Sequence, residues 1–512
     1  MRCWNRMFRP WACALMIGWL AGCGGGGGAA GGSTAGAGTQ QAPSTSAVSG
    51  VVNDAAGQPV AGVVVSVFHH NTHVTITATT DAAGRYQVAG LDNVSNADYA
   101  VYADRTGLAF SPSASDAAAE VTRMDFNGQY RTVVRLAALP ARDVAGVNFT
   151  ALRATDRLVS LPATGQQQTQ APGDDGAWRR GQAWPAPRWV DGGDGTVQDR
   201  LTGLVWLKDA GCLPADRWAQ ALAAVAQLAP GRCGLSDGSS AGQWRLPNVN
   251  ELESLVDASQ AGPALPLGQT FQRVRQDVPY WSSTTYTAVP TQAMAIRFSD
   301  GRWINGIDSG DAGLSNVKAV ASNGVWAVRS GAPGAVQLLA TGVYDGVGGP
   351  AALPGDDASL HKGVALPGNR FVDGGDGTVT DTATGLVWLK LANCIRQNWT
   401  DALAAVQVLA DGQCGLSDHS RAGQWRLPNR AEMLSLSDRA PTFPQASYLN
   451  GQYQGTATVN GPVIFGQMVV GDYYWTSTTS AADISQAWGV YSCDFGVYNL
   501  DKASVHVALA VR

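Results

Sequence analysis

The chain has 512 residues, of which 45% are apolar and 15% are charged, and 35 basic residues stand against 40 acidic ones. A chain of this length can build several hydrophobic cores, and two to four domains are expected. It has no run of lysine and arginine and a net charge of −5. This composition argues against nucleic acid and anionic lipid surfaces as partners.

Residues 1–22 predict a lipoprotein signal peptide. Three arginines form a basic start, and the apolar stretch that follows is too short to anchor the chain by spanning a bilayer. The stretch ends in "LAGC", so we expect cleavage before Cys23 and lipid on its thiol. An ordinary secretory signal is the alternative. Residue 24 is glycine, which in lipoproteins of this kind implies transport to the outer membrane, with the folded part facing the periplasm or the cell surface.

Residues 23–46 predict a flexible tether. They are rich in glycine, serine and alanine and contain no large apolar side chain that could build a core. A glycine-rich coil of this length reaches roughly 25–30 Å. The folded part is therefore expected to stand off a membrane to which the lipid attaches it.

Residues 47–152 predict an antiparallel β-sandwich. Short alternating segments are separated by turns rich in Gly, Asp and Pro, as in "VVNDAAGQPVAGVVVSV" and "TTDAAGRYQV". This order of pieces resembles the carboxypeptidase regulatory-like, transthyretin-type sandwich, which implies a spacer role. His69, His70 and His73 could include metal ligands, but neighbouring strand residues point to opposite faces, so an exposed loop is favoured.

The rest of the chain is one unit used twice, at 158–330 and 338–512. "TGLVWLK", "CGLSD" and "AGQWRLPN" all recur 181 or 182 residues later. Each unit is long enough to be a domain of its own. Apolar positions predict a helix that begins at Trp218 and its equivalent at Trp399, with strands before and after it. The fold class is therefore multidomain, an all-β sandwich followed by two α+β domains.

A second helix is predicted after "QWRLPN" in each unit. Asn248 and Glu251 have the spacing of a capping box, in which each side chain bonds the other's backbone amide. Asn429 and Glu432 repeat this spacing in the second unit.

Two pairs of cysteines occupy matching places in the two units. Cys212 and Cys233 are 21 residues apart, and Cys394 and Cys414 are 20 apart. In an oxidising compartment they predict two disulfides, each stabilising by about 3 kcal/mol. A zinc site is the alternative, but the chain lacks a CxxC pair or neighbouring histidines for it. Cys493 is left over and is expected to be a buried free thiol.

"VDGGDGTV" occurs at 190–197 and again at 372–379, and it has two interpretations. Its aspartates could bind calcium, but they are three residues apart, whereas a calcium loop places oxygen ligands at alternate positions. Gly-Asp-Gly between strands favours a hairpin turn. No His-Glu-x-x-His motif or phosphate-binding loop is present. We therefore expect no catalysis, no cofactor and no metal.

The blocks T-G-Q, G-D-D-G, D-x-G-D-G-T-V-x-D, T-G-L-x-W, W-R-L-P and Y-W-S-S-T resemble the C-terminal domain of the collagen-like Lcl adhesin. The resemblance covers 158–330 and 338–512, and copy two departs from it in "TGVYDGVGG" and "YSCDFG". "WRLPNVNEL" is also similar to a segment of formylglycine-generating sulfatase modifiers. That likeness implies a C-type-lectin-like fold, but the late cysteine pair of those enzymes is reduced here to Cys493.

The ligand face is predicted on copy one. Arg297, Arg302 and Trp303 follow or flank a turn signal, and arginine and tryptophan are typical of binding hot spots. Other tryptophans, such as Trp206 and Trp281, are expected in the core.

These features together predict a lipid-anchored, non-catalytic, adhesin-like binding protein. The Lcl resemblance implies a sulfated glycosaminoglycan as ligand. The net charge, −8 once the three signal arginines are removed, favours a neutral glycan or an envelope protein instead. A structural protein of the periplasm is the alternative, and an enzyme related to formylglycine-generating modifiers is a further one.

Overall fold

The computed structural model describes residues 45–93, 97–126, 129–153, 155–287, 289–304, 316–344, 352–368, 370–439, 465, 469, 471–492 and 495–512. The signal peptide, Cys23, nearly all of the tether and Cys493 lie outside these residues, so the predictions for them stay predictions. No helix within the described ranges is long and apolar enough to cross a membrane.

The first domain is the predicted β-sandwich. One sheet has the order β4 (Arg85–Asp92), β1 (Thr45–Asp54), β9 (Val147–Leu152) and β6 (Ala109–Ala114). The other has the order β3 (Thr75–Thr79), β2 (Val64–His69), β5 (Tyr99–Asp104), β8 (Gln129–Leu136) and β7 (Glu120–Phe126). Alternating side chains of both sheets are buried between them, such as Val88 and Phe149 of the first sheet and Val65 and Val67 of the second. The period of two read from the sequence therefore identifies this core correctly.

The histidines of this domain behave differently from one another. His70 and His73 are exposed in the turn after β2, as predicted. His69 is buried, and its ring centre lies 4.6 Å from that of Tyr99. The exposed-loop prediction is therefore wrong for His69, because it is the last inward-facing residue of β2.

Copy one consists of two sheets and two principal helices. The first sheet has the order β10 (Trp189–Asp191), β11 (Thr196–Asp199), β12 (Leu204–Leu207) and β18 (Val328–Ser330). The second has the order β13 (Leu213–Asp216), β17 (Asn323–Val325), β14 (Tyr280–Thr285), β15 (Ala293–Arg297) and β16 (Arg302–Ile304). The helices are α3 (Trp218–Ala226) and α4 (Val249–Glu253). Trp206, Trp244 and Trp281 are buried, as expected. The domain is thus β-rich with few helices.

Copy two repeats this plan. Its sheets have the orders β19 (Phe371–Asp373), β20 (Thr378–Asp381), β21 (Val387–Leu389), and β22 (Ile395–Gln397), β26 (His506–Ala508), β23 (Tyr473–Thr479), β24 (Gln486–Tyr491), β25 (Val497–Asp501). Its helices are α6 (Trp399–Gln407) and α7 (Arg430–Ser435). Buried side chains of the two copies form one continuous apolar cluster, so the copies share a core.

Local sequence explains where the helices lie. Trp218, Leu222 and Val225 form the buried stripe of α3. Both predicted capping boxes are present, at the start of α4 and at the start of α7. Each N-cap asparagine accepts from the N3 amide while the N3 glutamate accepts from the N-cap amide.

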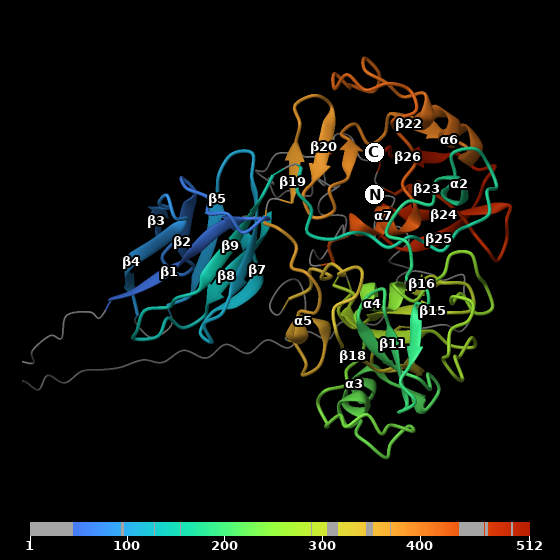
Figure 1. Cartoon of the computed structure of the whole chain (residues 1–512), viewed down its shortest axis with the longest axis horizontal. Helices are drawn as coiled ribbons and strands as arrows, with labels where there is room; N and C mark the ends of the chain where they lie inside the picture. Colours follow the sequence, from blue (N-terminus) through green and yellow to red (C-terminus); the bar gives the residue numbers. More distant parts are fainter. Residues whose placement is uncertain are drawn as a thin grey trace, which may run out of the picture.

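The segments that precede the two copies cross between them. We call residues 158–182 arm one and residues 338–364 arm two. Arm one contains the short helix α2 (Asp175–Trp178), which packs on β23 of copy two; arm two contains α5 (Asp357–Leu360), which packs on β14 of copy one. In Figure 1, α2 lies among the orange and red elements of copy two, and α5 lies beside the green elements of copy one.

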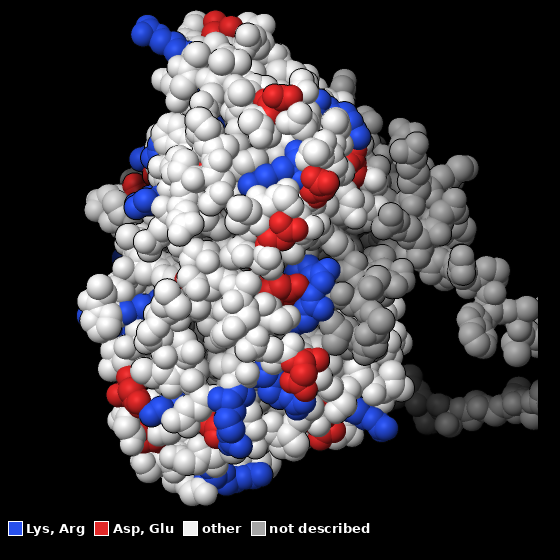
Figure 2. Space-filling view, turned by 90° about the vertical axis from the view of Figure 1, so that its right-hand side faces the viewer, with Lys and Arg blue, Asp and Glu red and all other residues white. Residues whose placement is uncertain are grey.

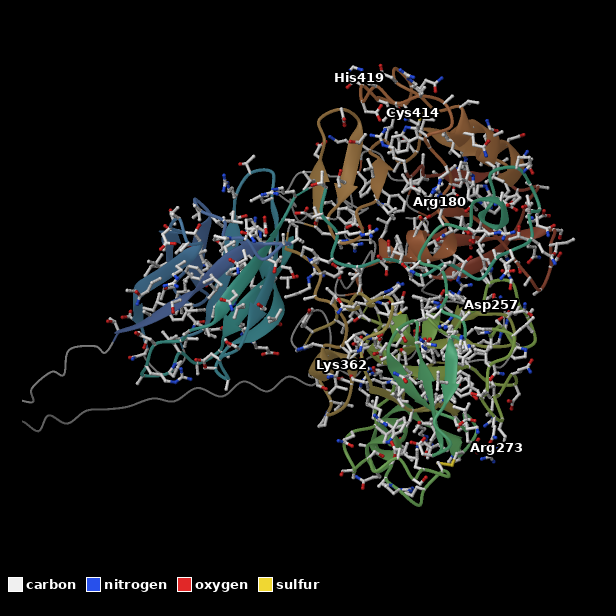
Figure 3. All side chains as sticks on the ribbon, viewed as in Figure 1. Arg180, Asp257, Arg273, Lys362, Cys414 and His419 are labelled. Atoms are coloured by element: carbon white, nitrogen blue, oxygen red, sulfur yellow. A yellow bond between two sulfur atoms is a disulfide. The ribbon has the colours of Figure 1, made fainter. Side chains whose placement is uncertain are left out.

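Hydrogen bonds fix this exchange in the same way on both sides. Asp175 accepts from Thr478 of copy two at 2.7 Å, and Asp357 accepts from Thr284 of copy one at 2.7 Å. Two further bonds join the helix caps to the arms: Asn429 Nδ2 donates to Arg180 O, and Asn248 Nδ2 donates to Lys362 O. Figure 3 labels Arg180 within copy two and Lys362 beside copy one.

Candidate functional site

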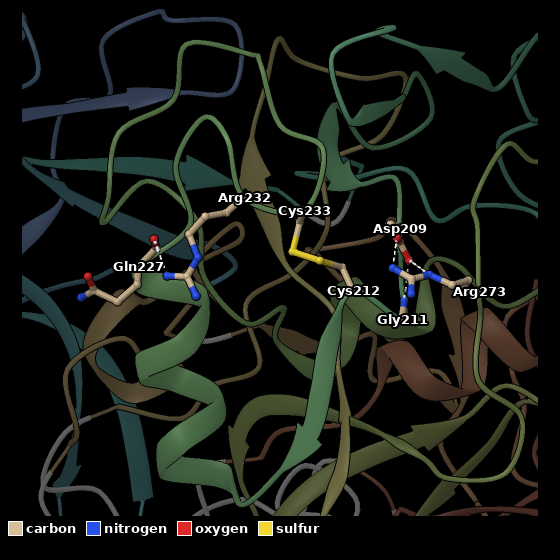
Figure 4. Close-up of a disulfide and its surroundings, with 7 residues drawn as sticks. All are labelled: Asp209, Gly211, Cys212, Gln227, Arg232, Cys233 and Arg273. Atoms are coloured by element: carbon tan, nitrogen blue, oxygen red, sulfur yellow. Dashed lines mark hydrogen bonds and ion pairs between the residues drawn. A yellow bond between two sulfur atoms is a disulfide. The ribbon is translucent and has the colours of Figure 1, made fainter.

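Both predicted disulfides are present. Cys212 at the start of β13 is joined to Cys233 in the loop after α3, with Cα atoms 5.6 Å apart. Cys394 and Cys414 make the equivalent link in copy two, with Cα atoms 5.7 Å apart. Figure 4 shows the copy-one disulfide between two polar contacts, Arg232 with Gln227 O and the ion pair of Arg273 with Asp209. The bonds fasten the loop after each helix to the sheet.

The repeated Gly-Asp-Gly segment is a hairpin turn, as predicted. β10 and β11 pair on either side of it, with Val190 opposite Gln198. Asp194 Oδ1 accepts from the amide and the hydroxyl of Thr196, and Asp191 forms an ion pair with Lys208. The aspartates therefore serve the turn itself. Within the described ranges, no group of three or more His, Cys, Asp or Glu side chains could hold a metal ion.

Trp303 is not exposed, contrary to the prediction. β15 and β16 do form a hairpin, but only 2% of the Trp303 residue surface is exposed. Its Nε1 donates to Glu253 at 2.6 Å, and the guanidinium of Arg439 lies 4.5 Å from its ring centre. Arg439 and Arg430, which pairs with Glu253, both come from copy two. The tryptophan is covered because the second copy packs over it.

The two arginines of the predicted ligand face are also engaged. Arg297 and Arg302 both form ion pairs with Asp300 at the tip of the hairpin. The structure brings Arg297, Arg302 and Trp303 close together, but as part of the joint between the copies. We therefore look for the ligand face elsewhere.

A groove that the sequence did not predict opens on copy one. It has a volume of about 610 Å³ and is formed by residues 166–168 and 170 of arm one, 184–189, 257, 259–260 and 266–268 of copy one, and 479–481 and 484 of copy two. We call it the copy-one groove. Figure 3 shows Asp257, one of its residues, on the side of the molecule away from the sandwich.

The floor of the copy-one groove is polar and buried. Asp257 is 5% exposed, and its Oδ1 accepts from the amide and hydroxyl of Ser259. Among the described residues, Ser259 is the only hydrogen-bond donor to the carboxylate of Asp257. Burial raises the pKa of this carboxyl, and the nearby Arg188 opposes that shift. Gln166 closes the floor by donating to Ala258 O and to Thr479 O of copy two.

Its walls carry an arginine stacked between two aromatic rings. The Arg188 guanidinium lies 4.6 Å from the ring centre of Trp184 and 4.3 Å from that of Trp189. It also binds Asp199 through two hydrogen bonds. Its Nη1 is buried and has no hydrogen-bond partner in the part of the chain that the structure describes.

The rim of the groove is apolar. Leu267 of copy one is 81% exposed and Ile484 of copy two is 65% exposed. Large exposed aliphatic side chains beside a polar floor are typical of a surface that binds a partner.

In copy two the equivalent surface is covered by the sandwich. Asp438, the equivalent of Asp257, is fully buried and forms an ion pair with Arg123 of β7. Thr132 of β8 donates to Leu366 O at 2.6 Å, and Gly368 N donates to Phe110 O at 3.0 Å. Figure 1 shows the sandwich against the β19 side of copy two.

One sequence pattern marks the aspartate of this site. "SLVD" at 254–257 and "SLSD" at 435–438 are equivalent blocks, each with a carboxylate after an apolar helix end. Their burial and their different neighbours depend on residues hundreds of positions away, so the sequence pattern alone could not rank them above other aspartates.

The sequence also contains one catalytic motif. Residues 234–238 read G-L-S-D-G and so fit the G-x-S-x-G pattern of a nucleophile elbow. In the structure Ser236 lies exposed in the loop after α3 and not between a strand and a helix, and Asp237 pairs with Arg329. No histidine occurs between residues 74 and 360. Ser236 therefore does not lie in the strand-to-helix turn of an elbow.

The face opposite the sandwich carries mixed charge. Figure 2 shows lysine and arginine side chains interspersed with aspartate and glutamate among larger uncharged areas. A polyanion is attracted over a distance by a large field of one sign, which this face does not present.

Comparison with family models identifies the repeated units. A model described as the Lcl C-terminal domain matches residues 195–329 and 377–512, more than half of the chain. A model described as the carboxypeptidase regulatory-like domain matches residues 47–129. Both resemblances read from the sequence are thereby confirmed. The matched Lcl ranges leave out both arms. The search of curated proteins gave no match.

Three solved structures show weak likeness. They are a 3-chlorocatechol 1,2-dioxygenase from Rhodococcus opacus (10% identity, 22% of this chain and 61% of that chain, TM-score 0.13), a 9R-lipoxygenase from Cyanothece (14%, 23% and 18%, 0.12) and a catechol 1,2-dioxygenase from Acinetobacter (11%, 22% and 55%, 0.13). The alignment spans less than two thirds of each of these proteins. TM-scores of this size carry no argument about fold or activity.

Proposed function

We propose that this chain, which belongs to the Lcl C-terminal domain family, is a non-catalytic, adhesin-like binding protein of the bacterial envelope whose ligand binds in the copy-one groove. The family assignment supports a binding protein of the cell surface. The groove supports the position of its ligand site. The observation that carries the proposal is the open, polar-floored groove of copy one, beside the covered equivalent in copy two.

A non-catalytic role agrees with the use of the buried charges. Four buried arginine–carboxylate pairs recur in equivalent positions of both copies: Arg188–Asp199, Arg245–Glu251, Arg370–Asp381 and Arg426–Glu432. Each holds structural elements together. Paired buried charges of this kind serve the fold.

Attachment to the outer membrane through lipid on Cys23 is part of the proposal. Two or three acyl chains together hold a protein stably on a membrane, and the glycine-rich tether leaves the folded part free to reach a ligand. Cys23→Ser should abolish incorporation of labelled palmitate, and labelling that persists in this variant would remove the anchor from the proposal.

Two ligand classes come from the sequence, a neutral glycan and an envelope protein. Tryptophan and glutamine side chains, such as Trp184 and Gln167, are suited to sugars. In copy two the β-sandwich of the same chain covers the equivalent surface, which favours a protein as the ligand of copy one.

The test is a binding assay on the soluble chain from residue 24 to 512. The labelled protein is applied to outer-membrane vesicles of the producing bacterium and to a glycan array. Leu267→Ala/Ile484→Ala should reduce binding by about tenfold or more if the rim contributes ~1.4 kcal/mol. Val408→Ala/Val505→Ala, which truncates two exposed valines outside the groove, is the control. Equal binding by both double variants would remove the groove from the proposal.

A further inference from the structure

We propose that the copy-one groove binds a β-strand edge of another protein that presents an arginine side chain to Asp257. The inference rests on the proposed function, since it names the partner of the same groove. It comes from the second copy, where an equivalent surface is seen with its occupant in place.

The equivalence is residue by residue. Offsets of 181 and 182 residues relate the two copies, so Asp438 corresponds to Asp257, Leu366 to Trp184 and Gly368 to Ala186. A glycine of each arm lies against the aspartate: a Cβ added at Gly165 would collide with Asp257. In the same way, a Cβ added at Gly342 would collide with Asp438. The two carboxylates therefore occupy the same place in the two domains.

Polar contacts from the described residues hold the occupant in copy two. The sandwich contributes the Arg123 guanidinium to Asp438, the Thr132 hydroxyl to Leu366 O and the Phe110 carbonyl to Gly368 N. These groups come from three strands, β7, β8 and β6. The side chains of Arg123 and Asp438 are only 2% and 0% exposed. Copy two thus shows that this surface accepts the edge of a β-sandwich that carries a buried arginine.

Copy one offers the same three groups without an occupant. Among the described residues, the second carboxylate oxygen of Asp257, the carbonyl of Trp184 and the amide of Ala186 have no hydrogen-bond partner. All three residues line the groove. The acceptor, donor and anionic groups that hold the sandwich in copy two are therefore available for a partner in copy one.

The chemistry of the groove favours a guanidinium over a sugar. A buried carboxylate that loses water on binding is costly unless a cation compensates it, and a neutral glycan supplies none. Arginine presents a planar fork of donors that matches a carboxylate better than the point charge of lysine. The exposed Leu267 and Ile484 add the apolar contact that protein interfaces use around a polar centre.

The partner is a different molecule from the sandwich of the same chain. That sandwich uses the edge formed by β6 of one sheet and β7 and β8 of the other on copy two, and the same edge cannot contact both grooves at once. A β-rich envelope protein with an exposed arginine on a strand is the occupant that the geometry describes.

The probe is a backbone-cyclised hairpin peptide with the sequence of residues 120–136, which carries Arg123 and Thr132. Its binding to the soluble chain 24–512 is measured by titration calorimetry. We expect saturable binding that weakens by about tenfold or more for Asp257→Asn, and likewise when Arg123 of the peptide is replaced by lysine. Asp277→Asn, an exposed carboxylate of copy one outside the groove, is the matched control and should bind as the wild type does.

Other outcomes overturn the inference. Absence of peptide binding, or binding that Asp257→Asn leaves unchanged, would overturn it. Capture of a neutral glycan that depends on Asp257 would replace the protein partner by a sugar. In these cases the proposed function still stands if Leu267→Ala/Ile484→Ala weakens binding to envelope vesicles, so the two failures are distinguishable.

Discussion

The two copies place equivalent aspartates in opposite circumstances. Asp438 is sealed under the sandwich against Arg123, whereas Asp257 lies on the floor of an open groove. The surrounding framework is the same, because Arg370–Asp381 repeats Arg188–Asp199. The same surface thus holds a neighbouring domain in one copy and stays open in the other.

The largest expected effect is on the covered side. Asp438→Asn leaves Arg123 buried without its charged partner, so the free energy of unfolding should fall by about 3–5 kcal/mol. Urea unfolding monitored by tryptophan fluorescence measures this. A loss below about 1 kcal/mol would mean that the sandwich is held mainly by other contacts.

The disulfides should be equivalent in the two copies. Their loops close 21 and 20 residues, so the Cys212→Ser/Cys233→Ser variant and the Cys394→Ser/Cys414→Ser variant should each lose about 3 kcal/mol. Thermal melts of the two variants give the comparison. Unequal losses would show that one copy depends more on its disulfide than the other.

A pH effect should separate the two arms. Burial raises the pKa of Asp175 to about 6 and that of Asp357 to about 7, from an ordinary value of 3.8. Because both folded values are raised, the native state binds more protons than the unfolded state above pH 3.8. Stability should therefore fall as pH rises towards 6 for Asp175 and towards 7 for Asp357.

Asparagine variants measure this difference. Asp357→Asn should flatten the fall in stability up to about pH 7 and Asp175→Asn only up to about pH 6, a difference of roughly 1.4 kcal/mol. Melting temperatures from pH 4 to pH 8 provide the readout. Identical pH profiles for the two variants would contradict the distinction between the arms.

The smallest effect is expected in the open groove. Asp257→Asn keeps the acceptor for Ser259 and removes a buried charge that has no ion-pair partner within hydrogen-bond distance, so the free energy of unfolding should stay the same or rise slightly. The same unfolding assay as for Asp438→Asn is used. A loss in the free energy of unfolding similar to that of Asp438→Asn would contradict the difference between the covered site and the open one.

Sequence reasoning succeeded where the contacts are local. The capping box of Asn248 and Glu251 spans three residues, and the turn at Asp194 involves its immediate neighbours. The disulfides followed because matching cysteines recur in both copies. Each of these features is decided within a short stretch of chain.

It failed where distant segments meet. Trp303 was expected at an exposed tip because nothing near it in sequence indicates that Arg439 of copy two covers it. The exchange of α2 and α5 is equally hidden, since both arms have the same pattern whether they fold back on their own copy or cross over. The copy-one groove combines residues from both copies and could not be assembled from one of them.

The crossing of the arms has a consequence for proteolysis. A single cut between residues 330 and 338 would produce two fragments, each holding a helical segment that the other needs to complete its packing. Thr478 would still bind Asp175 and Thr284 would still bind Asp357, so the nicked protein should migrate as one particle under native conditions and as two chains only in denaturant. A protease that reaches this connection would therefore leave the C-terminal copy attached to the rest of the molecule.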